Sequence, residues 1–250
     1  MKNKISYLII KLAGAGFSLS LFFMFILTAS KIDMYQFSRD ISSPLLWLAF
    51  FGYGFICSIM IDFILGKFLQ KSLSNKVILY AVAGFSIFFI YGFSIFTIIA
   101  GTIGALAAVF FCFGTAIANQ NSVFKYIFAF VMPIIFLIII NVDFTVKKQW
   151  TEVKSNTSFS ASFDFFNGEQ QIPIKAKAGQ TVSATIILSN ENGGGNGQHV
   201  LNEKGKLVPM YESTEERIKF KAEKSGVYRI VITGDDLKGS FSVDWEVAEL

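Results

Sequence analysis

The chain has 250 residues and a formal net charge of +4, and 53% of its residues are hydrophobic, including 29 phenylalanines. This apolar content exceeds that of ordinary globular proteins. It is concentrated before about Phe144, whereas the remainder is rich in Lys, Glu, Ser and Gly. Acids and bases nearly cancel in that remainder, so it has no basic surface for nucleic acid, and we expect no nucleic-acid partner. Both cysteines, Cys57 and Cys112, fall in apolar runs, which excludes a disulfide framework from the polar half.

Four apolar stretches occupy the first half of the chain. A membrane-spanning helix needs about 20 apolar residues, and the stretch 77–118 has roughly twice that length without a charged residue. We therefore predict two helices there, joined by a turn near Thr97–Gly101; four spans with a re-entrant piece are the alternative. Pro44 suits a helix start, and Pro133 predicts a kink. The region 1–146 is thus predicted to form an α-helical membrane bundle in the lipid bilayer, with spans at 12–29, 44–65, 77–97, 101–118 and 123–142.

Lysines at the ends of these spans predict an orientation. With five spans, three lysine clusters share one face, and the tendency of positive loops to stay inside makes that face cytoplasmic. The opposite face receives Lys31, Arg39, Lys147 and Lys148. We therefore expect a protein of the plasma membrane with its N-terminus inside and its C-terminal domain outside; four spans would put both ends inside. The clustered lysines are Lys2, Lys4, Lys11, Lys67, Lys71, Lys76 and Lys125.

Two features inside the spans have functional interpretations. Small residues recur at four-residue intervals, which predicts close helix packing, within the bundle or between copies of the chain in an oligomer. They are Ala100, Gly104 and Ala108 in one span and Gly14 and Ser18 in another. Asp62 is the one acid within a predicted span, and we expect an interfacial pair with Lys67. The spans otherwise lack the buried charges that ion-coupled transport needs.

The region 147–250 is predicted to form an extracytoplasmic all-β domain. Lys147, Lys148 and Trp150 after the last span suit an anchor at the membrane interface. Apolar residues then alternate with polar ones, as in strands with one face on a core. Six segments show this pattern: Phe159–Phe165, Ile172–Ala176, Val182–Leu188, Ile218–Ala222, Tyr228–Ile232 and Phe241–Val247, with two more strands expected near Val200 and Leu207–Tyr211. Turns are predicted at Asn167–Gly168, Ala178–Gly179, Lys204–Gly205, Ser225–Gly226 and Lys238–Gly239. This pattern predicts a two-sheet sandwich.

The order of motifs in residues 171–247 resembles that of the bacterial pre-peptidase C-terminal domain and its jelly-roll relatives. Ala178-Gly179-Gln180-Thr181-Val182 opens a strand, and Ser225-Gly226-x-Tyr228 begins another. The resemblance implies a jelly-roll-like, non-catalytic accessory module on the extracytoplasmic side that binds carbohydrate or protein. This chain departs from the pattern in following membrane spans rather than an enzyme and in its Gly-rich insertion, Asn190–Gly197. The membrane half resembles no family.

The residues indicate no catalytic, cofactor or metal site. The single histidine, His199, cannot build a usual zinc site, since both cysteines are in the spans. No nucleophile elbow accompanies it. The Gly-rich insertion lacks the Gly-Lys-Ser/Thr ending of a phosphate loop. Asp235 and Asp236 are explained by turn chemistry rather than calcium. Because loops on a rigid scaffold often carry recognition, we predict a partner-binding loop composed of Asn190, Glu191, Asn192, Gln198 and His199.

Three functions remain open. The first is a non-enzymatic envelope protein that presents the β domain to a protein or glycan, alone or within a complex. The second is a transporter or channel subunit with the β domain as a gate or docking module. The third, an enzyme acting at the membrane interface through Asp62, has the least support from the residues, so we expect no enzymatic activity.

Overall fold

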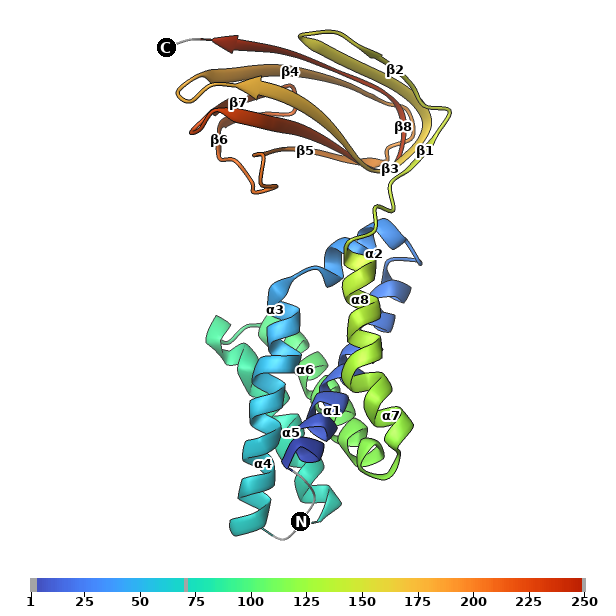
Figure 1. The fold of residues 1–250 in the computed structure, drawn as a ribbon, viewed down its shortest axis with the longest axis vertical. Helices are drawn as coiled ribbons and strands as arrows, with labels where there is room; N and C mark the ends of the chain where they lie inside the picture. The colour runs from blue at the N-terminus through green and yellow to red at the C-terminus, as the bar shows by residue number, and fades with distance from the viewer. Residues whose placement is uncertain (1–3, 70–71, 249–250) are drawn as a thin grey trace. The chain divides into compact units, whose positions relative to one another are not determined.

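The computed structural model describes residues 4–69 and 72–248. The chain separates into two compact units, Met1–Val142 and Asp143–Leu250, of which the first is helical and the second is an antiparallel β domain (Figure 1). Lys2 and Lys71, two of the lysines used to predict the orientation, lie outside the described residues.

Among the described residues, five helices are long and apolar enough to cross a membrane. Together with the β domain they confirm the predicted fold class, a five-helix bundle followed by a β-sandwich. The first crossing is α1 (Lys4–Ala29), and the second combines α3 (Pro44–Trp47), the π-helical η1 (Leu48–Gly54) and α4 (Phe55–Lys67). The third is α5 (Leu73–Ser86) with the 3-10 segment η2 (Ile87–Tyr91). The fourth is α6 (Ile95–Gln120), and the fifth is α7 (Ser122–Tyr126), π-helical η3 (Ile127–Val131) and α8 (Met132–Ile140).

The turn that divides the long apolar stretch lies earlier than predicted. Helical structure stops at Tyr91, and Gly92 adopts a φ of 80°, a conformation that suits glycine. The Ser94 side chain then accepts a hydrogen bond from the Thr97 backbone N–H and caps α6. The predicted turn at Thr97–Gly101 is therefore wrong, because these residues form the first turns of α6. The prediction relied on apolar content, which does not show that Ser94 caps the start of α6.

A short helix, α2 (Met34–Ile41), lies in the connection between the first two spans and was not predicted. Asp33 caps its N-terminus by accepting a hydrogen bond of 3.0 Å from the Gln36 N–H. Its buried face places Phe37 against Phe23 of α1, with ring centroids 6.4 Å apart. Eight residues are too few for a helical period to stand out between two much stronger apolar signals.

Pro133 is accommodated by a π-helical segment. Proline donates no hydrogen bond, and its ring collides with the carbonyl four residues earlier in a regular α-helix. The widened turns of η3 end at Val131, just before this position. The helix is thus irregular just before Pro133, whereas the predicted kink stays a prediction.

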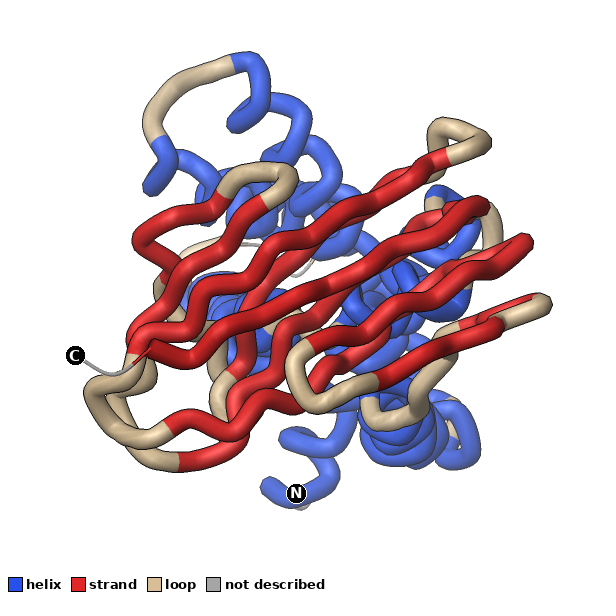
Figure 2. Tube along the Cα trace, turned by 90° about the horizontal axis from the view of Figure 1, so that it is seen from above, coloured by secondary structure: helices blue, strands red, loops and turns tan. Residues whose placement is uncertain are grey.

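The described part of the second unit, residues 143–248, contains eight strands in one continuous antiparallel sheet that folds into two layers (Figure 1). Figure 2 looks onto one layer, in which the strands lie side by side. The order is β1-β3-β8-β4-β7-β6, with β2 on β3 and β5 on β8. The strands are β1 (Val146–Lys148), β2 (Thr151–Lys154), β3 (Ser158–Ala176), β4 (Thr181–Asn190), β5 (Gly195–Leu201), β6 (Met210–Ser213), β7 (Arg217–Lys221) and β8 (Gly226–Ala248).

Two predicted turns are bends within long strands. At Asn167–Gly168 the β3–β8 pairing shifts register while β3 continues, and at Lys238–Gly239 β8 continues in the same way. Gly168 and Gly239 have φ values of 134° and 137°. Glycine serves bulges and hairpins alike, so the residues alone did not distinguish a bend from a reversal. Because β3 and β8 run through both layers, they join the two faces of the core.

Candidate functional site

The helical unit contains an ion pair between the buried Lys11 of α1 and the partly exposed Asp62 of α4. Lys11 is 2% exposed, and its Nζ lies 2.6 Å from Asp62 Oδ2. The Tyr7 hydroxyl donates to the same oxygen at 3.0 Å, and Lys76 Nζ of α5 lies 3.7 Å from Oδ1. Three donors from two neighbouring helices thus surround one carboxylate. A buried charge is costly unless it is paired, so the cluster is the first candidate for a functional site.

Polar contacts continue inward from this pair. Lys11 Nζ also donates to the Ser58 carbonyl at 3.4 Å, and the hydroxyls of Ser58 and Tyr80 lie 2.6 Å apart. Each helix contributes two residues four positions apart, a spacing that places both on one helix face. We call this set the charge cluster: Tyr7 and Lys11 on α1, Ser58 and Asp62 on α4, and Lys76 and Tyr80 on α5.

The predicted pairing of Asp62 with Lys67 is wrong. Residues five positions apart face different sides of a helix. Lys67 Nζ instead lies 5.8 Å and 5.2 Å from the ring centroids of Phe63 and Phe68. The expectation that the spans bury no further charge fails at Lys11, which we had assigned to the flank before Leu12. The sequence did contain a sign of the charge cluster: at the ends of three spans, two polar residues stand four positions apart.

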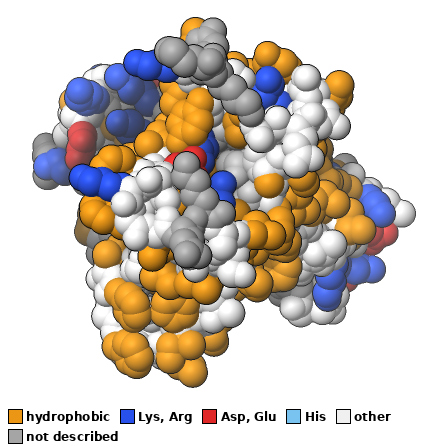
Figure 3. Space-filling model, turned by 90° about the horizontal axis from the view of Figure 1, so that it is seen from below, with side chains coloured by type: hydrophobic (Ala, Val, Ile, Leu, Met, Phe, Trp, Pro, Cys, Tyr) orange, Lys and Arg blue, Asp and Glu red, His pale blue; other side chains and the backbone are white. Residues whose placement is uncertain are grey.

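The charge cluster reaches the surface at the end of the bundle where α1 begins and α4 ends. The Asp62 and Lys76 side chains are 30% and 28% exposed. Figure 3 views the molecule from this end and shows acidic and basic side chains among hydrophobic ones. The cluster is therefore buried on its Lys11 side and accessible on its Lys76 side.

A cavity of about 520 Å³ adjoins the cluster and shares Tyr80 with it. Its volume lies within the range of small-molecule sites, which are likewise mostly apolar with a few polar groups. It lies between the second and third spans, with α1 and α6 as its remaining walls. The polar lining residues are Ser18, Ser43, Tyr53, Tyr80 and Tyr91; the apolar ones include Leu45, Leu48, Ile61, Phe88, Ile90, Ala107 and Phe111.

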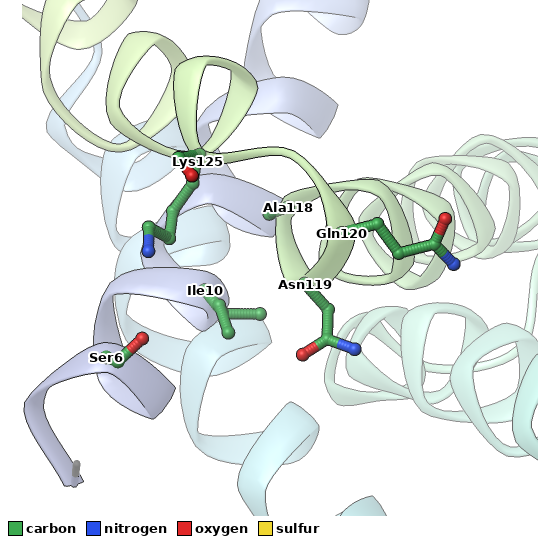
Figure 4. Close-up of a pocket in the computed structure, with 7 residues that line it drawn as sticks. Ser6, Ile10, Ala118, Asn119, Gln120 and Lys125 are labelled. Carbon is green, nitrogen blue, oxygen red and sulfur yellow. The ribbon is translucent and has the colours of Figure 1, made fainter. Parts of the chain in front are cut away.

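A smaller hollow of about 220 Å³ lies between the start of α1 and the α6–α7 connection. Figure 4 shows Lys125 and Asn119 directed towards the space beside Ile10, whereas Gln120 points away from it. Ser6 and Ser122 complete its polar lining. One cation and several neutral polar groups would suit an anion better than a cation.

The small residues predicted to pack helices lie at contacts within the chain. A Cβ built on Gly104 would lie 2.4 Å from the Gly84 carbonyl oxygen, and one built on Gly84 would lie 2.6 Å from the Ala108 Cβ. Gly14 approaches Thr115 in the same way, and the Ser18 hydroxyl donates to the Ala107 carbonyl at 2.6 Å. Ala100 lies one turn before Gly104 on α6 and is half-buried. The spacing therefore serves the α5–α6 and α1–α6 contacts; oligomerisation stays a prediction.

The predicted partner-binding loop is a short, internally bonded connection. Asn190 ends β4, and its Oδ1 accepts from the Gly193 N–H at 2.8 Å. Asn192 Nδ2 donates to the Asp236 carbonyl at 2.7 Å. Gln198 and His199 lie in β5, where Gln198 donates to the Thr214 carbonyl and His199 pairs with Val231 of β8. Glu191 remains exposed. The asparagine side chains thus hold the loop itself, and its role in binding stays a prediction.

The predicted interface anchor lies against the core of the β domain. The Trp150 ring stacks on Phe163 with centroids 5.2 Å apart, and its Nε1 donates to Glu152 at 2.8 Å. Lys147 Nζ lies 4.4 Å from the Trp150 centroid, and partial burial there lowers the pKa of Lys147. Lys148 lies over Phe165 at 5.0 Å. Trp150 therefore has packing partners of its own, and its contact with a membrane stays a prediction.

Fold and site define a class: a multi-span helical membrane protein with a C-terminal β domain and a partly buried ion pair in its bundle. A comparison with models of protein families finds no match to this chain, and a comparison with curated protein sequences finds none either. The resemblance to the pre-peptidase C-terminal domain thus stays a prediction. Among residues 4–69 and 72–248, no group of three or more His, Cys, Asp or Glu side chains is placed to hold a metal ion.

Proposed function

We propose that this protein is a non-enzymatic, multi-pass protein of the plasma membrane that presents its β domain outside the membrane to a protein or glycan partner. The observation that carries the proposal is a hydroxyl-rich, nearly uncharged face on the β2-β3-β8-β4 layer. An outward sheet face of a soluble domain usually carries many charges, so an uncharged one suits recognition.

The strand register defines this face. Alternate residues Phe159, Ala161, Phe241 and Val243 are buried, so their neighbours point outward. One row across the sheet reads Val153, Ser160, Ser242 and Ile187. The serine face, as we call it, comprises two uncharged rows: Val153, Ser160, Ser242 and Ile187, and Thr151, Ser162, Ser240 and Ser189.

Its chemistry suits a neutral, polar partner. Each hydroxyl is both donor and acceptor, and can match the hydroxyls of a glycan or the amides of a protein. Val153 and Ile187 are 68% and 62% exposed and add apolar contact area within the face. Charged residues begin in the next row, where Asp244 lies between Ser158 and Thr185 and Arg217 pairs with Thr185. Glu246 and Lys219 flank Ser183 beyond it.

Charge introduced into this face is expected to abolish partner binding. In Ser160→Lys/Ser242→Lys, two ammonium groups would lose hydration on contact with a neutral partner. We expect at least tenfold weaker recovery of partners in pull-downs from detergent and in glycan-array binding. Glu223→Lys, in the exposed loop before β8, adds the same side chain elsewhere and should bind as the wild type does. Equal binding by all three proteins would contradict the role of the serine face.

The proposed orientation rests on the lysines at one end of the bundle. Four lysines lie where the crossings meet one face of the bundle. They are Lys4 at the start of α1, Lys67 at the end of α4, Lys76 near the start of α5 and Lys125 in α7. The preference for positive charge on the cytoplasmic side supports an inside N-terminus and an outside β domain.

Cysteine labelling is expected to report this orientation. Ser213→Cys in β6 should react with a membrane-impermeant maleimide in intact cells, because Ser213 is exposed in the β domain. The matched variant Ser122→Cys, exposed at the start of α7, should react only after lysis. Labelling of Ser122→Cys but not Ser213→Cys in intact cells would reverse the orientation.

The charge cluster favours a second candidate, a transporter or channel subunit. Ionisable groups buried within membrane spans often mark ion or proton pathways. Solute or proton flux through the purified protein in liposomes, lost in Lys11→Met/Asp62→Leu, would support this function over the first.

A further inference from the structure

We infer that the 520 Å³ cavity of the helical unit binds one acyl chain of a membrane phospholipid, inserted from the end of the bundle at which α3 begins and η2 ends. The inference is independent of the function proposed for the β domain. It rests on the shape, the lining and the two ends of the cavity.

The cavity lining is exposed from its outer end to its middle, where Leu48 is 62% exposed, and buried at the other end. Leu45 and Ile90 line it near the start of α3 and the end of η2, and they are 72% and 76% exposed. Ile61, Tyr80 and Phe111 line its opposite end and are buried. A ligand therefore enters beside Leu45 and Ile90 and stops at Tyr80, whose hydroxyl is already bonded to Ser58.

Its dimensions fit a single extended chain. Leu45 and Ile61 are separated by about 24 Å of helix at a rise of 1.5 Å per residue. The volume of about 520 Å³ is distributed along this length, so the cavity is elongated. Packed carbon chains are about 4–5 Å wide, because their atoms approach to about 4 Å. An α-helix with its side chains is about 10–12 Å wide, so a helix from a second copy does not fit.

The lining selects hydrocarbon over water. Most of the lining residues are apolar, and a cavity of this kind does not hold ordered water. The hydroxyls near the outer end belong to Ser43 and Tyr91, where an ester or headgroup of a lipid would lie. Tyr53 donates to the Ala83 carbonyl at 2.6 Å and so presents its ring to the cavity wall rather than an unsatisfied hydroxyl.

The π-helical segment η1 forms part of this wall. Leu48, Ala49 and Phe50 line the cavity from η1. A π-helical insertion in an α-helix changes which side chains face a given side, and such insertions occur frequently at functional sites. The π-helical segment thus lies at the wall of the cavity, where it sets which side chains face the ligand.

Photocrosslinking tests the inference. The full-length protein in nanodiscs would receive phosphatidylcholine with a diazirine either at the end of one acyl chain or near its ester. We expect adducts at Ile61, Tyr80 or Phe111 with the terminal probe and at Leu45, Ile90 or Tyr91 with the ester-proximal probe. Ala107→Phe fills the middle of the cavity and should reduce the deep adducts at least tenfold.

The matched control is Ala116→Phe, which adds the same ring to an exposed position of α6 outside the cavity lining and should keep the deep adducts. Ala49→Phe fills the cavity from η1 and replaces Ala107→Phe if the latter does not fold, as judged by size-exclusion profile. Deep adducts that persist in a folded filling variant would overturn the inference. So would wild-type adducts confined to the outer surface of the bundle. Adducts formed only by an isoprenoid probe, and not by the acyl probes, would overturn the assignment to an acyl chain.

Discussion

Asp62→Asn is expected to lower the free energy of unfolding by about 3–5 kcal/mol, because it leaves the Lys11 ammonium buried without its carboxylate. After this change, Lys11 Nζ keeps the Ser58 carbonyl at 3.4 Å, a long and uncharged contact. Thermal or denaturant unfolding of the full-length protein in detergent measures the loss. A loss below about 1 kcal/mol would show that the pair is solvated in the folded protein.

The opposite single variant should cost less. In Lys11→Met, Asp62 keeps the Tyr7 hydroxyl and Lys76, and it is itself partly exposed. The double variant Lys11→Met/Asp62→Leu should recover most of the stability, since an apolar pair of similar volume often replaces a buried ion pair without loss. Strong non-additivity between the two sites is therefore expected. Additive single effects would mean that Lys11 and Asp62 do not interact in the folded protein.

A second large effect is expected from Gly239→Ala, in the bend of β8. Its φ of 137° disfavours any side chain, and a Cβ there would lie 1.9 Å from the Ser189 carbonyl oxygen. Backbone strain and overpacking each cost about 1–3 kcal/mol, so we expect a loss of about 3–5 kcal/mol. Denaturant unfolding of the full-length protein, followed by fluorescence of the β-domain tryptophans Trp150 and Trp245, measures it.

Gly179→Ala separates the two causes. Gly179 also has a positive φ, 90°, but no atom lies within 4 Å of a Cβ built there. It should lose only the strain contribution, about 1–2 kcal/mol. Equal losses at Gly179 and Gly239 would indicate that the close approach of β4 to β8 is not required for stability.

The two long bent strands show why the β domain was predicted in its parts and not in its connections. The alternation of Phe159, Phe163, Ile230 and Val243 correctly identified residues that face the core. Alternation reports only which side of a strand is buried. Whether the chain reverses or bends at a glycine depends on the strands that pair with it, here β4 and β5 on the two halves of β8.

In the helical unit, too, the sequence predicted the elements but not the contacts between them, as the charge cluster shows. Hydropathy identified five apolar helices because each span alone must satisfy its backbone in lipid. It assigned Lys11 to a flank, although α1 continues as a regular helix from Lys4. Only the packing of α1 and α5 against α4 brings Tyr7, Lys11, Asp62 and Lys76 together.

The sequence by itself determined the solvent of each half of the chain, since apolar content and period-two alternation are local properties of consecutive residues. It also predicted close packing at the small residues of α1 and α6. Only the tertiary structure decided the charge cluster, the cavity and the serine face. Each is composed of residues from at least three helices or strands far apart in the chain, and no local pattern encodes which of them meet.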